Sequence, residues 1–273
     1  MEVILLGTGF PLPEPDRAGP ATLVRVAGMD LLFDAGRGLL MRMRGANSGP
    51  VQVHTVFLTH LHSDHICDFN DLLTMHWAMN LAPAPLHVIG PAGTQAFVDD
   101  TLTMLRPDID WRIEHHEDLT WEPDVHVREV RDGVVFEQNG VRVIAAPTLH
   151  LPVKDTVGFR VEHDGRAVVI GGDSVPCEGL DRLCAGADVY VQTVLRRPLI
   201  ENIPAQCLRE ILNYHSSTED AAQTAARAGV KTLVFTHMMP NHMRGTEQDW
   251  INDAKPLFDG DVILGEDLQR IDV

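Results

Sequence analysis

Several side chains that commonly bind metal ions are concentrated in one short segment, Thr59-His60-Leu61-His62-Ser63-Asp64-His65. The apolar run Thr55–Leu58 comes directly before them and predicts a buried strand. Alternate side chains of an extended segment point the same way, so His60, His62 and Asp64 can converge, and His65 then begins a predicted helix. A polar loop with incidental histidines is the alternative, but it does not explain this density of ligands directly after a strand. Because imidazole and carboxylate groups are ordinary zinc ligands, the segment predicts a metal site.

The composition narrows the kind of protein. The chain has 273 residues, 44% of them hydrophobic, and a net charge of −17. We therefore expect a globular chain with no membrane span or signal peptide, located in the cytoplasm. Proteins that bind the phosphates of nucleic acids usually show a basic stripe, and none is visible in this sequence. On this criterion a nucleic acid partner is not expected, and a small-molecule ester is. The four cysteines form no C-x-x-C pair and predict buried thiols in a reducing compartment.

The elements that must position the ligands alternate along the whole chain. Strands are predicted at Val3–Leu6, Thr22–Val26, Leu31–Phe33, Thr55–Leu58, Leu86–Ile89, Val141–Ala145, Val157–Val161, Ala167–Ile170, Val189–Gln192, Thr232–Thr236 and Val262–Leu264. Helices are predicted at Ile66–Met79, Thr94–Met104, Thr218–Ala226 and Gln248–Ala254. No linker or repeat divides the chain. The pattern predicts one α/β domain over residues 1–273, with mixed sheets.

These motifs resemble the metallo-β-lactamase superfamily. The H-x-H-x-D-H segment, the early turn Gly7-Thr8-Gly9 and the turn Phe33-Asp34-Ala35-Gly36 carry the resemblance. It implies a four-layer αββα sandwich of two mixed β-sheets flanked by helices. It also implies that Asp34 orients a ligand histidine.

The same resemblance implies a dinuclear metal centre. One metal would take His60, His62 and His150, the other would take Asp64, His65 and His237, and Asp173 would bridge them. Two Zn²⁺ ions per chain are expected, although Mn²⁺ or iron would accept the same ligands. Redox di-iron relatives usually have Glu where His62 stands, so the site favours hydrolysis.

Two further segments resemble the ribonuclease Z branch, Asn213-Tyr214-His215-Ser216-Ser217-Thr218-Glu219-Asp220-Ala221-Ala222 and Ala228-Gly229-Val230-Lys231-Thr232-Leu233-Val234-Phe235-Thr236-His237. The resemblance implies that His215 protonates the leaving oxygen and that Asp64 helps to hold or deprotonate the attacking water. Cationic side chains suited to an anionic substrate group are Arg17, Arg196 and Arg197, and ordinary surface arginines are the alternative for all three.

Three departures from that branch favour a smaller substrate than transfer RNA. The phosphate-contacting loop is altered at Pro13-Glu14-Pro15-Asp16-Arg17-Ala18, and Thr193 replaces the glutamate that would partner the catalytic histidine. The interval from His150 to Asp173 is also too short for the family's RNA-gripping arm. We therefore expect a dinuclear zinc hydrolase, a homodimer like many relatives, that cleaves small phosphodiester or arylsulfate esters through a metal-bridging hydroxide.

Three other functions stay open from the sequence. The first is a lactonase or other carboxylic-ester hydrolase, because the same pair of metals serves that chemistry. The second is a true ribonuclease Z, the 3′ tRNA processing endonuclease. The third is a non-catalytic, metal-binding regulatory protein that kept the fold and lost turnover.

Overall fold

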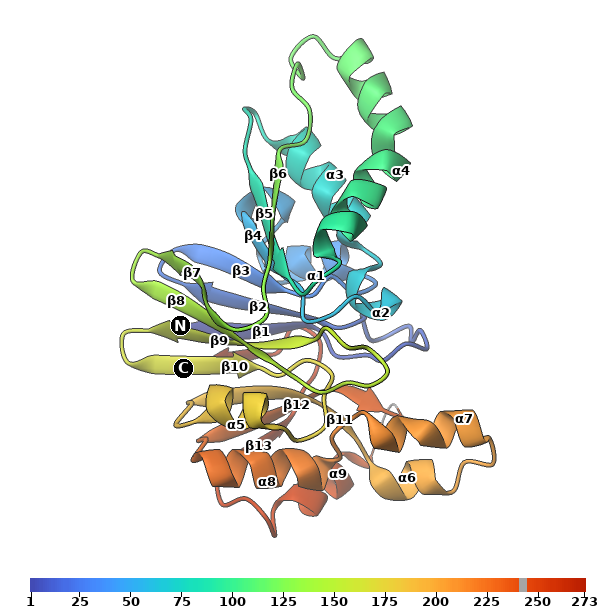
Figure 1. Ribbon diagram of the computed structural model, residues 1–273, viewed down its shortest axis with the longest axis vertical. Helices are drawn as coiled ribbons and strands as arrows, with labels where there is room; N and C mark the ends of the chain where they lie inside the picture. The colour runs from blue at the N-terminus through green and yellow to red at the C-terminus, as the bar shows by residue number, and fades with distance from the viewer. Residues whose placement is uncertain (241–244) are drawn as a thin grey trace.

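A computed structural model describes residues 1–240 and 245–273, and two mixed seven-stranded sheets form its centre (Figure 1). The first sheet has the strand order β14-β1-β2-β3-β4-β5-β6. Strands β14, β1, β2 and β3 pair antiparallel, and β3 to β6 pair parallel. The bounds are β1 Glu2–Gly7, β2 Ala21–Val26, β3 Met29–Phe33, β4 Thr55–Phe57, β5 Leu86–Gly90, β6 Val125–Glu129 and β14 Arg270–Asp272.

The second sheet has the order β13-β12-β11-β10-β9-β8-β7 and is also mixed. Strands β7 to β10 pair antiparallel, and β10 to β13 pair parallel. The bounds are β7 Gly133–Gln138, β8 Val141–Pro147, β9 Val157–His163, β10 Arg166–Ile170, β11 Val189–Leu195, β12 Thr232–Met239 and β13 Asp261–Leu264.

Helices cover the outer face of each sheet. The first sheet carries α1 Leu39–Gly45, α3 Phe69–Met79 and α4 Thr94–His115, and the second carries α5 Glu178–Cys184, α8 Thr218–Ala228 and α9 Glu247–Ala254 (Figure 1). Shorter helical turns are η1 Pro50–Gln52, α2 Ser63–Ile66, α6 Arg197–Glu201, α7 Gln206–Arg209 and η2 Glu210–Asn213. The predicted four-layer αββα sandwich is confirmed.

Three layers of apolar side chains hold the sandwich together. Side chains from both sheets meet between them, where Phe57 packs 5.3 Å from Phe159 between ring centroids. Leu72 lies in the layer under the first sheet's helices, and Trp250 lies in the layer under the second sheet's helices. Strands that are buried on both faces read as continuous apolar runs, which explains why β4 and β10 were predicted from sequence.

The sequence did not predict strands β6, β7 and β14, and two further features differ from the sequence prediction. Helix α4 continues to His115, although Pro107 lies inside it and removes a backbone donor. Ile109 is buried against Trp77 and Leu119, and this packing maintains the helix beyond the proline. The expected burial of the thiols is wrong for Cys67 and Cys207, which are exposed; all four cysteines are free.

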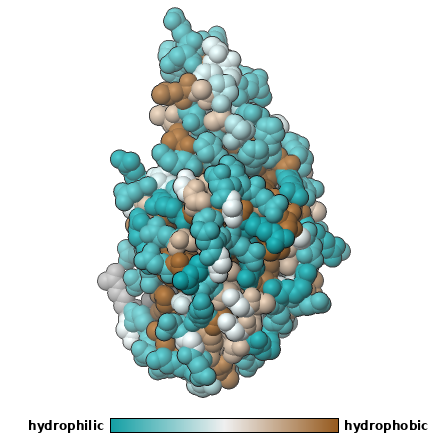
Figure 2. All heavy atoms as spheres, turned by 90° about the vertical axis from the view of Figure 1, so that its left-hand side faces the viewer, coloured by the Kyte–Doolittle hydropathy of each residue, from teal (hydrophilic) through white to brown (hydrophobic). Residues whose placement is uncertain are grey.

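The surface of the protein is largely hydrophilic on the side that carries the chain ends. Figure 2 shows this face as mostly teal, with scattered apolar side chains. Within the described part of the chain, no helix is both long and apolar enough to cross a membrane.

Candidate metal centre

The seven predicted ligands come from five places in the sequence and meet at one end of the sandwich. His60 and His62 lie between β4 and α2, and Asp64 and His65 lie in the first turn of α2. The remaining ligands follow strands or lie near their ends: His150 after β8, Asp173 after β10 and His237 in β12. The carboxyl ends of neighbouring parallel strands meet at one edge, and open α/β sheets place their sites there.

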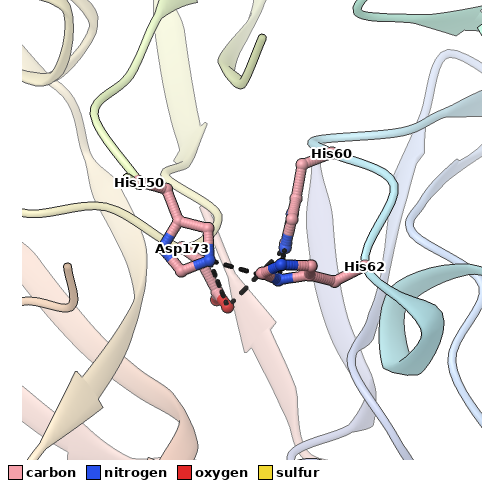
Figure 3. A group of neighbouring side chains, drawn as sticks. All are labelled: His60, His62, His150 and Asp173. Atoms are coloured by element: carbon pink, nitrogen blue, oxygen red, sulfur yellow. Dashed lines mark hydrogen bonds and ion pairs between the residues drawn. The ribbon is translucent and has the colours of Figure 1, made fainter. Parts of the chain in front are cut away.

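Four of these side chains form a first ligand group, His60, His62, His150 and Asp173, and point toward one another from opposite sides (Figure 3). Nε2 of His60 lies 3.1 Å from Nδ1 of His62, and Nε2 of His150 lies 3.2 Å from the same atom. Two ligands of one tetrahedral ion, each about 2.1 Å from it, lie about 3.4 Å apart. The spacing of these nitrogens therefore suits one shared cation.

Asp64, His65 and His237 form a second ligand group. Nε2 of His237 lies 3.0 Å from Oδ2 of Asp64, and Nε2 of His65 lies 3.7 Å from the same oxygen. Asp173 connects the two groups, because its Oδ2 is 3.4 Å from Nε2 of His65 and 3.8 Å from Nε2 of His60. The two groups contain the residues that were expected from sequence, and the role of each residue as a metal ligand stays a prediction.

Unpartnered buried atoms test whether these residues fit metal ions. Nε2 of His65 and Oδ1 of Asp173 are buried and have no hydrogen-bond partner among the described residues. Such an atom costs free energy unless something else pairs with it. Nε2 of His65 faces Oδ2 of Asp64 and Oδ2 of Asp173, and Oδ1 of Asp173 belongs to the carboxylate that lies between the two groups. A pair of divalent cations would satisfy them, so the donor set fits a dinuclear metal centre.

Electrostatics prepares most of the ligands for metal binding. Burial lowers the pKa of His60 well below its usual range and lowers that of His150 to about 4, so both imidazoles are neutral. Burial raises the pKa of Asp64, but the hydrogen bond from His237 and the charge of His65 outweigh it and bring the value to about 2. Metal ligation requires neutral imidazoles and ionised carboxylates, and these three groups supply them.

Asp34 supports the centre from behind. Its Oδ1 accepts a hydrogen bond from the backbone N–H of Thr59, and its Oδ2 accepts one from the Thr59 hydroxyl, each at 2.8 Å. Nδ1 of His65 also lies 2.8 Å from Oδ2, which leaves Nε2 of His65 facing the centre. Asp34 adopts a left-handed backbone with φ of 60°, which fits strain held at functional sites.

Two further supporting groups were not identified from sequence. The hydroxyl of Thr59 lies 3.0 Å from Nδ1 of His60 and so connects Asp34 to a ligand of the first group. The backbone carbonyl of Tyr214 lies 2.8 Å from Nδ1 of His150. A threonine next to the motif is a weak signal, and a backbone carbonyl gives no sequence signal, so only the fold shows these contacts.

His215 lies beside both ligand groups and belongs to neither. Its Nε2 is 3.2 Å from Oδ2 of Asp173, and its ring centroid is 4.7 Å from that of His150. Thr193 stands where the resemblance would place a glutamate partner, and the carbonyl of Ile211 lies 3.3 Å from Nδ1 of His215 instead. The residue that caps the following helix is Ser217, in a capping box with Asp220.

The three predicted substrate-binding arginines all have partners within the protein. Arg17 donates to the hydroxyl of Thr8 at 2.5 Å and to the carbonyl of Gly265. Arg196 pairs with Asp253 and Asp249, and Arg197 pairs with Asp220. A role in substrate binding stays a prediction for each of them.

Comparison with known proteins first defines the class. The family described as the Beta-lactamase superfamily domain matches residues 30–238. The metallo-beta-lactamase fold protein YhfI from Bacillus subtilis superposes with a TM-score of 0.76 at 20% identity, covering 99% of this chain and 98% of its own. The short form of human tRNase Z superposes with a TM-score of 0.74 at 24% identity, covering 100% and 99%. These likenesses establish the metallo-β-lactamase fold.

The curated relatives identify the branch. Ribonuclease Z of Mycolicibacterium gilvum is 50% identical over 275 residues, covering 100% of this chain and 96% of its own. Ribonuclease Z of Mycobacterium marinum is also 50% identical, covering 100% and 99%. The chain belongs to the ribonuclease Z family and is a metal-dependent hydrolase.

This result corrects two expectations from sequence. The view that nucleic acid is an unlikely partner and that a small ester is the substrate is wrong, because the full-length relatives are named ribonucleases. Net charge sums the whole surface and says little about the field at one groove. The short interval after His150 was also misleading, since an alignment of 275 residues over almost the whole relative leaves no room there for a long arm. Arylsulfate esters, which were part of the expected substrate class, have no support.

Proposed function

We propose that this chain is a true ribonuclease Z, an endonuclease that processes the 3′ ends of transfer-RNA precursors. The observation that carries the proposal is the assembly of all seven ligands and His215 at one place, in a chain that is 50% identical to a ribonuclease Z over its full length. We further propose Zn²⁺ as the native metal, because sites of histidine and carboxylate ligands with an open position suit catalytic zinc.

The residues around the centre have distinct tasks in this reaction. When bound, two divalent ions supply a hydroxide nucleophile at neutral pH and positive charge for the developing oxyanion. Asp64, which is ionised because its pKa is about 2, can hold a hydrogen of the attacking water. Nε2 of His215 is the nitrogen that faces Asp173, so it is placed to give its proton to the leaving oxygen. Asp34 keeps His65 oriented through Nδ1.

The surface beside the centre offers room for an RNA strand. A hollow of about 490 Å³ reaches Thr148 and Leu149, the residues just before His150 in the chain. Arg131 and Lys154 also line it, and neither forms an ion pair with another described residue. Glu129 lines it too, but its carboxylate accepts hydrogen bonds from the backbone of Gly93 and Gln95 at the start of α4. The side chains of Arg131 and Lys154 are therefore available to bind RNA phosphates.

A cleavage assay tests the proposal directly. Purified protein with two Zn²⁺ per chain is mixed with a precursor transfer RNA that carries a 3′ trailer, and the cut position is mapped at nucleotide resolution. We expect a single cut at the trailer boundary, lost in Asp173→Ala and retained in the matched surface control His126→Ala, whose side chain is 58% exposed. Hydrolysis of bis-p-nitrophenyl phosphate without cleavage of the precursor would contradict the proposal.

A further inference from the structure

Tyr214 places an aromatic ring directly against the reaction centre. It follows η2 and precedes His215, and its ring centroid is 4.8 Å from that of His215, at an interplanar angle of 51°. The centroid of the His150 ring is 5.4 Å away, at 75°. The ring therefore touches both a metal ligand and the proposed proton donor, and its backbone carbonyl also accepts the hydrogen bond from His150.

Apart from these two histidines, neither a hydrogen bond nor core packing explains the Tyr214 side chain. Within residues 1–240 and 245–273 its hydroxyl forms no hydrogen bond, and its ring belongs to none of the apolar core clusters. The other tyrosine of the chain, Tyr190, is fully buried and donates to Gln192 at 2.6 Å. Tyr214 is instead only partly buried, so part of its ring faces solvent.

Two large apolar side chains that adjoin His150 in the chain are exposed. Leu149 and Leu151 flank His150 in the chain, and 42% and 56% of their surfaces are exposed. A partly exposed aromatic ring against the centre and two exposed leucines next to His150 in the chain do not suit an anion. They suit the flat face of a nucleobase, which stacks on aromatic side chains when RNA is held in a single-stranded form.

We propose that Tyr214 is a substrate-positioning residue that stacks on a nucleobase adjacent to the scissile phosphate. The inference rests on the proposed function, because it requires an RNA substrate. Stacking of one base would fix the strand beside His150 and His215. It would also hold the phosphate in register with the metal centre.

A double-mutant cycle separates stacking from structural support of the two histidines. The variants are Tyr214→Phe and Tyr214→Leu, and the substrates are an intact precursor transfer RNA and copies with an abasic site on either side of the cut. With intact RNA we expect Tyr214→Phe to behave as wild type and Tyr214→Leu to raise KM roughly 5- to 100-fold, the usual value of one stacked base. With the abasic substrate that lacks the stacked base, Tyr214→Leu should have almost the same KM as wild type.

A purely structural role gives a different result. If the ring only supports His150 and His215, Tyr214→Leu will lower kcat by the same factor on intact and abasic substrates, and this would overturn the inference. Metal content and melting temperature identify any damage to the fold. The matched control is Trp111→Leu, which removes an aromatic side chain, 66% exposed, from α4 and should leave KM unchanged.

A binding measurement distinguishes failure of this inference from failure of the proposed function. RNA with 2-aminopurine next to the cut position is titrated with wild type and with Tyr214→Leu. Absence of cleavage by wild type would reject the proposed function. If wild type quenches the 2-aminopurine fluorescence and Tyr214→Leu does not, stacking is supported even when wild type does not cleave. Equal quenching by both proteins, or no binding by either, would reject the inference.

Discussion

The contact between Asp34 and His65 allows a sharp prediction about metal affinity. Replacing Asp34 by Asn keeps the shape of the side chain, and Asn tolerates the left-handed backbone at φ 60°. One carboxylate oxygen, however, becomes an NH₂ group. In the wild type both oxygens accept, from the N–H and hydroxyl of Thr59 and from Nδ1 of His65, each at 2.8 Å.

Either orientation of the new amide creates a conflict. If NH₂ faces His65, the ring must accept at Nδ1 and carry its hydrogen on Nε2, the atom that faces Asp64 and Asp173. If NH₂ faces the backbone of Thr59, two donors oppose each other in a buried place. Loss of such a supporting contact lowers metal affinity about 10- to 100-fold. One charge-assisted hydrogen bond is worth about 1.5–3 kcal/mol, which corresponds to a melting temperature roughly 3–10 °C lower.

The assay is competition for Zn²⁺ with a chromophoric chelator, followed by metal analysis of the dialysed protein. The matched control is Asp30→Asn. Asp30 also accepts several hydrogen bonds, from Arg25 at 2.8 Å and 3.0 Å and from Ser48 at 2.6 Å, but it lies outside the centre. We expect the control to lose stability and keep both ions. Wild-type affinity for two ions in Asp34→Asn would refute the reasoning.

Three other outcomes are expected. Prolonged chelation should remove two ions per chain and abolish activity, and activity should return with added Zn²⁺; full activity in protein shown to be metal-free would contradict the dinuclear centre. His215→Ala should keep both metals and lower kcat by about 10²- to 10⁴-fold, with a smaller loss for p-nitrophenolate leaving groups; equal, wild-type rates on both leaving-group classes would exclude a proton-donor role. Iodoacetamide at pH 8 should label Cys207 and spare Cys184, because burial raises the pKa of the Cys184 thiol far above the pH and so removes the reactive thiolate, as peptide mass spectrometry would show.

The sequence determined the chemistry of the centre because its ligands are dictated by residue type and by short-range spacing. The segment from His60 to His65 follows a run of buried residues, and strand alternation places its ligands together. The later ligands, His150, Asp173 and His237, could be assigned through the resemblance because each follows or ends a recognisable strand. The alternation of apolar runs and helices predicted an α/β domain with mixed sheets, and the resemblance to the superfamily added the four αββα layers.

Other features could be decided only by the tertiary structure, because they depend on contacts between distant segments. The continuation of α4 past Pro107 requires Trp77 and Leu119. Strand β6 carries charged residues and forms because it pairs with β5. Its own sequence therefore does not predict a strand. The carbonyls of Ile211 and Tyr214 position His215 and His150, although every residue type has such a group. The net charge misled the prediction of the substrate for a similar reason. A total over the chain carries no information about which charges surround the surface where RNA would lie.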